Sequence, residues 1–271
     1  MTRRSFALAA LAPDLPDIRT VTPDLTLPPL ADGPPAPGRR VRVGSAELYH
    51  VLYLPVDWTP RRRYPVIVEY AGNGNYRNAY GDVSLGVPEG SHLGYGLSAG
   101  HGFIWLCLPY VGAGRRNEIQ WWGDADATTA YCRAEVARVC RDYGGDPRRV
   151  LLAGFSRGAI ACSYLGLRDE ATSRLWRAFF AYSHFDGVRE WPYPDSDRAS
   201  ALQRLRRLRN RRVFVCHENS VEATQSFVKS AGVRGQFTFE RLAFRNHNDA
   251  WVLRDLAERR HARAWLRSAL G

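Results

Sequence analysis

The sequence predicts an α/β fold in which a mostly parallel central sheet carries helices on both faces. Strand-like and helix-like segments alternate from residue 46 to the C-terminus, and such alternation produces parallel strands joined by crossover helices. In addition, the run from Gly102 to Leu108 is continuously apolar. A strand buried on both faces of a sheet has this composition.

The individual elements follow in order along the chain. Runs rich in β-branched and aromatic residues, bounded by Pro and Gly, indicate strands at residues 46–54, 65–70, 102–108, 149–153, 178–182, 212–216 and 237–244. Runs with apolar or small residues at helical spacing indicate helices at residues 124–143, 159–167, 199–209, a stretch ending at 228, and 251–270. Ligands of such sheets bind beyond the carboxyl ends of the strands, so the loops after strands should contain the site.

The 271 residues are expected to form one domain over residues 40–271, preceded by a tail and linker over residues 1–39. Thr2 to Phe6 resembles the start of a twin-arginine export signal, but the apolar stretch from Ala7 to Ala12 is short for one. Residues 13–38 are rich in Pro, Asp and Gly, which indicates a linker or an extended strap. Localisation therefore stays open between the cytoplasm and export.

Composition and charge exclude several classes of protein. No apolar run reaches the roughly 18 residues that a membrane-spanning helix needs, which excludes a membrane-spanning role. The formal net charge is +11, but Lys229 is the only lysine. The arginines between residues 204 and 212 alternate with leucines. They are interpreted as the solvated face of an amphipathic helix, so nucleic acid is not the favoured partner.

The cysteines do not indicate a disulfide framework or a metal site. Their number is odd, and none of them forms a CxxC pair. Cys107, Cys162 and Cys216 lie among apolar residues, where a free cysteine behaves as a small hydrophobe. No metal and no cofactor is expected.

A serine nucleophile is indicated at Ser156. The segment from Gly154 to Gly158 has the pattern Gly-x-Ser-x-Gly, with a predicted strand before it and a helix of small residues after it. A sharp strand-to-helix turn strains the backbone at the serine and requires small residues two positions before and after it. The turn exposes the hydroxyl at the helix N-terminus, where the amide of Arg157 favours a developing oxyanion. The alternative is an ordinary turn with a capping serine.

A general base for Ser156 is predicted at His247, which follows the last predicted strand and precedes the last helix. Imidazole suits this role because its pKa lies near neutrality, so it can accept and later return a proton. The other histidines have less favourable contexts, although His184 and His217 lie at strand ends and could line the site.

The acid that would orient the histidine has three candidates. Glu218 follows the strand that ends at Cys216, and Asp186 follows the preceding strand. Glu218 is favoured over Asp186, and Glu222 ranks third because it falls within the next predicted helix.

The second donor of an oxyanion hole is expected in the glycine-rich loop Ala71 to Asn75, with Asn73 as the donor and Gly72 shaping the turn. A glycine-rich hairpin without a catalytic role is the alternative. The loop lacks the lysine of a P-loop and the spacing of a dinucleotide fingerprint. Trp121 and Trp122 could wall a pocket for an aromatic or sugar group, or simply pack the structure.

Together these motifs resemble the α/β-hydrolase superfamily, and most closely its branch of feruloyl and acetyl xylan esterases and polyhydroxybutyrate depolymerases. The resemblance runs from about residue 46 to the end. It is carried by Tyr53 to Pro55, Tyr64 to Val68, Asp146 to Val150 and Gly154 to Ala159. Two departures are that Ala71-Gly72 replaces the usual His-Gly of the oxyanion loop, and that the acid loop after Cys216 is short.

The resemblance implies a Ser-His-acid triad, an acyl-enzyme intermediate and no metal. The leading hypothesis is a serine-dependent carboxylic-ester hydrolase acting on small-molecule or polymer-linked esters, including carbohydrate-linked and polyester-type ones. The alternatives are a serine peptidase of the prolyl-oligopeptidase type and a binding protein that retains the hydrolase fold without turnover. The sequence leaves the natural ester and the oligomeric state open.

Overall fold

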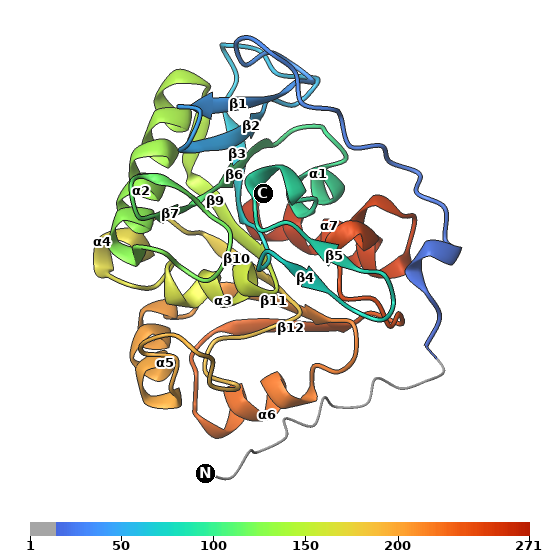
Figure 1. The fold of residues 1–271 in the computed structure, drawn as a ribbon, viewed down its shortest axis with the longest axis vertical. Coiled ribbons are helices and arrows are strands. Elements are labelled where there is room, and N and C mark those ends of the chain that lie inside the picture. Colours follow the sequence, from blue (N-terminus) through green and yellow to red (C-terminus); the bar gives the residue numbers. More distant parts are fainter. Residues whose placement is uncertain (1–14) are drawn as a thin grey trace.

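Eight strands form one sheet in the computed structural model, which describes residues 15–271 (Figure 1). Their order is β1-β2-β6-β3-β9-β10-β11-β12. Strand β2 runs antiparallel to both of its neighbours, and all other pairs are parallel. The bounds are Arg40–Gly44 (β1), Tyr49–Tyr53 (β2), Tyr64–Tyr70 (β3), Ile104–Leu108 (β6), Gly145–Phe155 (β9), Ala178–Tyr182 (β10), Arg212–His217 (β11) and Gln236–Arg241 (β12). The predicted α/β class is confirmed.

Helices cover both faces of this sheet, and each face has its own apolar core. Side chains alternate along β3, so Val66 and Val68 belong to one core and Ile67 to the other. The first core is closed by α2 (Ala125–Asp142), α3 (Arg157–Tyr164), α5 (Arg198–Leu205) and α6 (Glu222–Ser230). The second is closed by α1 (Leu93–Ser98) and α7 (Ala257–Leu270). A short helix, α4, spans Glu170–Ser173.

Two small hairpins interrupt the alternation and were not predicted. One joins β4 (Tyr76–Arg77) to β5 (Val83–Ser84), and the other joins β7 (Tyr110–Gly112) to β8 (Arg116–Glu118). Their strands have two or three residues, too short for an alternating pattern to stand out in the sequence. Both hairpins lie in the loops that follow β3 and β6, on the side of the sheet where the site was expected.

Some predicted boundaries also differ from the structure. The last helix begins at Ala257 rather than at 251, because a 3₁₀ turn at Asp249–Leu253 and extended backbone at Arg254 and Leu256 precede it. The last strand ends at Arg241 rather than at 244. The chain then leaves the sheet. In the loop that follows, the side chain of Asn246 and the amide of His247 donate to Asp82.

Residues 15–39 form a strap that packs against the domain. Ile18 is buried, and its amide donates to Oδ1 of Asn246 at 2.7 Å. Farther along, the Asp24 carboxylate pairs with Arg259 of α7 at 2.6 Å. The export-signal-like segment Thr2 to Ala12 lies outside the described residues. All five cysteines are free and buried, and residues 15–271 include no helix that is long and apolar enough to cross a membrane.

Candidate active site

The turn between β9 and α3 has the strained geometry that the sequence predicts at Ser156. Its φ is 55° and its ψ is −114°, a conformation that non-glycine residues rarely adopt. A Cβ at Gly154 would lie 2.1 Å from the carbonyl carbon of Gly158, and one at Gly158 would lie 1.9 Å from the carbonyl oxygen of Tyr70. Both glycines are therefore required by close backbone contacts.

The structure brings Ser156, His247 and Glu218 together from three separate loops. Ser156 Oγ lies 3.0 Å from Nε2 of His247, and Nδ1 of the same imidazole lies 2.5 Å from Oε1 of Glu218. The side chain of His247 retains 14% of its surface exposure, while Glu218 is buried. The hydroxyl can thus transfer its proton to an imidazole that a buried carboxylate orients.

Ser183, at the end of β10, adds a hydroxyl to this chain of hydrogen bonds. Its Oγ donates to Glu218 Oε1 at 3.0 Å and lies 2.9 Å from His247 Nδ1. Burial raises the pKa of Glu218, but the charge of His247 and its hydrogen bond outweigh burial and lower that pKa to about 2. Glu218 is therefore a carboxylate at neutral pH, able to stabilise an imidazolium.

The two rival acids lie elsewhere. Asp186 is buried and forms a bidentate pair with Arg204, with Nε and Nη2 at 2.9 and 3.1 Å from its oxygens. Arg204 was interpreted as part of a solvated basic face, and this was wrong for this residue, because Asp186 draws it into the interior. Glu222 is the exposed first residue of α6.

Asp82, which the sequence did not single out, holds the loop that carries His247. It is buried and accepts from the amide of His247 at 2.8 Å and from the side chains of Asn246 and Asn248 at 3.0 and 2.7 Å. Asn78 supplies a fourth donor at 2.7 Å. The asparagines on both sides of His247 were the available signal, but no sequence pattern connects them with a carboxylate 165 residues away.

The amides of Asn73 and Arg157, predicted as oxyanion donors, donate to no protein acceptor within residues 15–271. The side chain of Arg157 contributes in a way that was not predicted. Its buried guanidinium donates to the carbonyl oxygens of Trp121 at 2.6 Å, Gly72 at 2.9 Å and Gly86 at 3.2 Å. It also lies 3.7 Å from the centre of the Tyr110 ring. These contacts offset its burial without a carboxylate and hold the loop that presents Asn73.

Aromatic side chains form a wall from His247 to the Asn73 loop. The His184 ring lies 5.6 Å from His247 and 4.9 Å from Trp191, and Trp191 lies 5.6 Å from Trp121. The amide of Trp121 donates to the side chain of Asn73 at 2.8 Å. Burial lowers the pKa of His184 to about 3, and the charge of His247 acts in the same direction. His184 is therefore neutral near pH 7.

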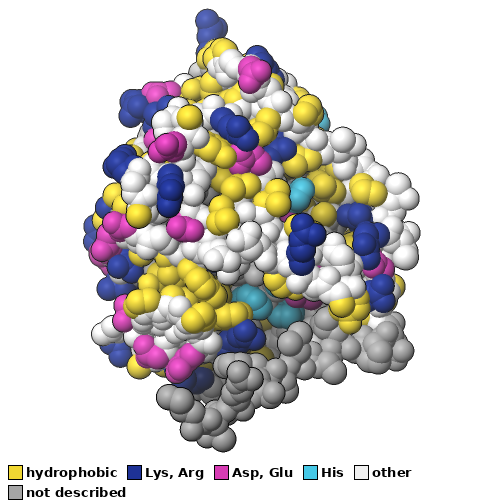
Figure 2. All heavy atoms as spheres, in the orientation of Figure 1, with side chains coloured by type: hydrophobic (Ala, Val, Ile, Leu, Met, Phe, Trp, Pro, Cys, Tyr) yellow, Lys and Arg dark blue, Asp and Glu magenta, His cyan; other side chains and the backbone are white. Residues whose placement is uncertain are grey.

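The two predicted pocket tryptophans differ in exposure. Trp121 is half-buried and belongs to this wall, whereas Trp122 is buried and stacks on Tyr164. Histidine side chains reach the surface near the centre of the face shown in Figure 2, beside an apolar patch. Within the described part of the chain, no three His, Cys, Asp or Glu side chains are grouped so that they could hold a metal ion.

Solved structures with the same architecture are found among esterases and peptidases. An S-formylglutathione hydrolase from Agrobacterium tumefaciens is 15% identical with a TM-score of 0.57, over 85% of this chain and 94% of the other. An esterase from Rhizomucor miehei is 14% identical with a TM-score of 0.56, over 91% and 86%. Dipeptidyl peptidase 4 from Porphyromonas gingivalis is 17% identical with a TM-score of 0.51, over 86% and 35%.

The fold is the α/β-hydrolase fold. Coverage varies among proteins that share it: the chain spans 62% of a thermostable esterase and 35% of a dipeptidyl aminopeptidase IV from Bacteroides ovatus. No protein-family model and no curated protein matches the sequence. At these identities, the similarity supports the α/β-hydrolase fold alone.

Proposed function

We propose that this chain is a serine-dependent carboxylic-ester hydrolase, with Ser156 as nucleophile, His247 as general base and Glu218 as acid. The observation that carries the proposal is the chain of hydrogen bonds from Ser156 Oγ through His247 to Glu218, with distances of 3.0 and 2.5 Å, at a strained strand-to-helix turn. A nucleophile within reach of a base, and a base oriented by a third group, is the geometry that nucleophilic catalysis requires.

The reaction follows from these positions. Ser156 Oγ attacks the ester carbonyl as its proton moves to His247 Nε2, and the amides of Asn73 and Arg157 stabilise the resulting oxyanion. The tetrahedral intermediate collapses, His247 returns the proton to the leaving alcohol, and an acyl-enzyme remains. Water then attacks the acyl carbon while His247 takes its proton. Collapse of the second intermediate releases the acid and returns the proton to Ser156.

Arg157 and Asp82 act in this proposal as positioning residues. The Arg157 guanidinium fixes the carbonyl of Gly72, directly before Asn73. Asp82 fixes the backbone amide of His247. Neither side chain needs to contact the substrate, because displacement of a reacting group by about 1 Å already costs up to about a hundredfold in rate.

The substrate class is proposed from the aromatic wall. Trp121 and Trp191 are both half-buried, so part of their surface is available in the wall that continues from His247 through His184. Such surfaces suit an ester that carries an aromatic or sugar ring. This fits the resemblance to the branch of feruloyl and acetyl xylan esterases and polyhydroxybutyrate depolymerases, with small-molecule or polymer-linked esters as substrates.

A peptidase is the second candidate, because peptidases are also among the proteins with this fold. The chain spans 35% of those two chains, so a peptidase activity would have to work without most of their length. Release of p-nitroaniline from dipeptide substrates would identify it. A folded protein that cleaves neither substrate type would support the third reading, a binding protein.

The test is hydrolysis of short- and medium-chain p-nitrophenyl esters together with labelling by a fluorophosphonate. We expect stoichiometric labelling of Ser156 and a fall in kcat of at least about 10³-fold in Ser156→Ala. The matched control is Ser268→Ala, at an exposed serine of α7. A folded wild type that neither hydrolyses these esters nor becomes labelled would contradict the proposed function.

A further inference from the structure

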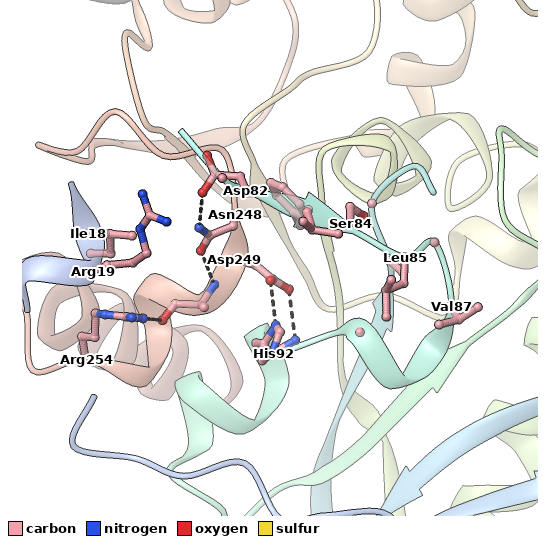
Figure 3. Close-up of a pocket in the computed structure, with 18 residues that line it drawn as sticks. Ile18, Arg19, Asp82, Ser84, Leu85, Val87, His92, Asn248, Asp249 and Arg254 are labelled. Atoms are coloured by element: carbon pink, nitrogen blue, oxygen red, sulfur yellow. Dashed lines mark hydrogen bonds and ion pairs between the residues drawn. The ribbon is translucent and has the colours of Figure 1, made fainter. Parts of the chain in front are cut away.

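We infer a second binding site, for a small amphiphilic carboxylate, in a cavity that Asn248, the residue after His247, helps to line. The cavity has a volume of about 380 Å³ and lies between the strap at Ile18 and Arg19, the segment from Gly81 to Val87 and the segment from Asn248 to Arg254 (Figure 3). This volume lies within the range of small-molecule sites, about 300–1,000 Å³.

The cavity borders the proposed catalytic residues without containing them. Gly72, Phe155 and Asn248 line it, and they are the chain neighbours of Asn73, Ser156 and His247 respectively. The three functional residues do not line it. A ligand in this cavity therefore contacts the chain neighbours of the reacting residues rather than the reacting residues themselves, and it need not be the ester that is cleaved.

One wall offers a positive charge without a counter-ion. Arg254 is 8% exposed, and it donates from Nε to the carbonyl of Val21 and from Nη1 to the carbonyl of Ala250, both at 2.7 Å. Within residues 15–271 its guanidinium makes no ion pair, and Nη2 has no hydrogen-bond partner. A largely buried cation that is fixed and unpaired favours an anionic ligand.

The acidic groups around the cavity already have donors. Both oxygens of Asp82 accept hydrogen bonds, including one from Asn248, and both oxygens of Asp249 accept from His92. Arg19, the other arginine in the lining, is neutralised by its bidentate pair with Asp17. The donors to Asp82 are neutral amides, so its negative charge stays in the lining. Arg254 is the lining arginine without a carboxylate partner among residues 15–271.

The opposite wall is apolar. Leu85 and Val87 lie across the cavity from Arg254 (Figure 3). Leu85 and Val83 keep 60% and 47% of their surface exposed, so they have few protein partners of their own. A ligand that satisfies both walls has a carboxylate for Arg254 and an alkyl chain that reaches Leu85. A medium-chain carboxylate such as octanoate has this chemistry.

The experiment is calorimetric titration of the full chain with octanoate, octanamide and acetate. Octanamide keeps the chain without the charge, and acetate keeps the charge without the chain. We expect saturable binding of octanoate, with affinity at least about tenfold higher than for the other two. Equal binding of octanoate and octanamide, or no binding of octanoate, would overturn the site.

Two variants locate the binding in this cavity. Arg254→Gln removes the charge, and we expect octanoate to bind at least about tenfold more weakly. Because Arg254 also holds two backbone carbonyls, Leu85→Asp provides a second test at an exposed position that leaves those contacts in place. We expect the same weakening from Leu85→Asp and none from Leu30→Asp, which alters another exposed leucine outside the lining. Wild-type affinity in the folded cavity variants contradicts the inference.

Repeating the titration with Ser156 blocked by a fluorophosphonate separates the two sites. We expect unchanged octanoate affinity, whereas loss of binding would assign octanoate to the ester site and overturn the inference. The titration of unmodified protein does not depend on ester hydrolysis. Failure of the proposed function and failure of this site are therefore distinguishable.

Discussion

Glu218 and Asp186 are buried carboxylates that follow neighbouring parallel strands, yet their surroundings differ. Glu218 follows β11 and faces the imidazole of His247, while Asp186 follows β10 and faces the guanidinium of Arg204. His247 can take up and release a proton, whereas arginine stays protonated in proteins. The position after a strand therefore places a carboxylate near the site, and the partner decides what it can do there.

The electrostatics of the two carboxylates differ in the same way. Burial raises the pKa of both groups. At Glu218 the charge and hydrogen bond of His247 outweigh burial, so its pKa falls to about 2. At Asp186 burial dominates, and Arg204 offsets only part of the rise in pKa. We therefore interpret Glu218 as a functional carboxylate and Asp186 as a structural one.

Replacing Glu218 should have the largest effect on activity. In Glu218→Gln the imidazole loses the carboxylate that orients it and stabilises its charged form, so we expect kcat for p-nitrophenyl acetate to fall about 10³–10⁴-fold. Asp186→Asn, which leaves the Ser156–His247–Glu218 chain intact, is the matched control. An active Glu218 variant combined with an inactive but folded Asp186 variant would exchange the two assignments.

Replacing Asp186 should instead affect stability. In Asp186→Ala the Arg204 guanidinium remains buried without its partner, so we expect a loss of about 3–5 kcal/mol in the free energy of unfolding. Urea denaturation followed by circular dichroism measures it, with kcat determined on the folded fraction. The double variant Asp186→Ala with Arg204→Met should recover part of the loss. A stability like that of the wild type would show that the pair is not structural.

The pH dependence of stability should distinguish the two carboxylates further. Because the folded-state pKa of Glu218 is about 2 and its ordinary value is 4.5, its stabilisation is complete above pH 4.5 and is lost as the pH falls toward 2. The shift corresponds to about 2–4 kcal/mol. Between pH 6 and 3, unfolding of Glu218→Gln should therefore depend less steeply on pH than unfolding of the wild type. Parallel curves would contradict this interpretation of Glu218.

A smaller effect is expected at Asp82, a third buried carboxylate. Asp82→Asn weakens the contacts that fix the His247 loop, so we expect kcat to fall about 10- to 100-fold with little change in KM. If Asp82 had only a structural role, its replacement would lower stability without lowering the kcat of the folded protein. Both quantities are measured with the same p-nitrophenyl ester.

The features that sequence alone predicted are those built from residues close together in the chain. The fold class follows from the alternation of strands and helices. The spacing of apolar residues that marks each strand or helix can be recognised within a short stretch of sequence. The turn at Ser156 follows from glycines two positions on either side of it, and the clashes at Gly154 and Gly158 explain why no other residue fits. His247 was predicted from its place in the loop after the last strand.

Contacts between segments that are distant in the sequence could not be predicted from local sequence patterns. The side chain of Arg157 reaches Trp121 and Gly72, Asp82 lies 165 residues from His247, and the strap brings Ile18 to Asn246. The two short hairpins were missed because their strands have only two residues (β4 and β5) or three residues (β7 and β8). These features depend on which loops meet above the sheet, and no local pattern contains that information.

The sequence by itself determined that parallel strands alternate with helices and that Ser156 lies in a strained turn, because sterics and periodicity act between near neighbours. Only the tertiary structure decided which carboxylate meets His247. Glu218 and Asp186 are both acidic residues after parallel strands, and only the packing of α5 brings Arg204 to Asp186 and leaves Glu218 to His247. The same packing of distant segments left Arg254 without a counter-ion beside an apolar wall.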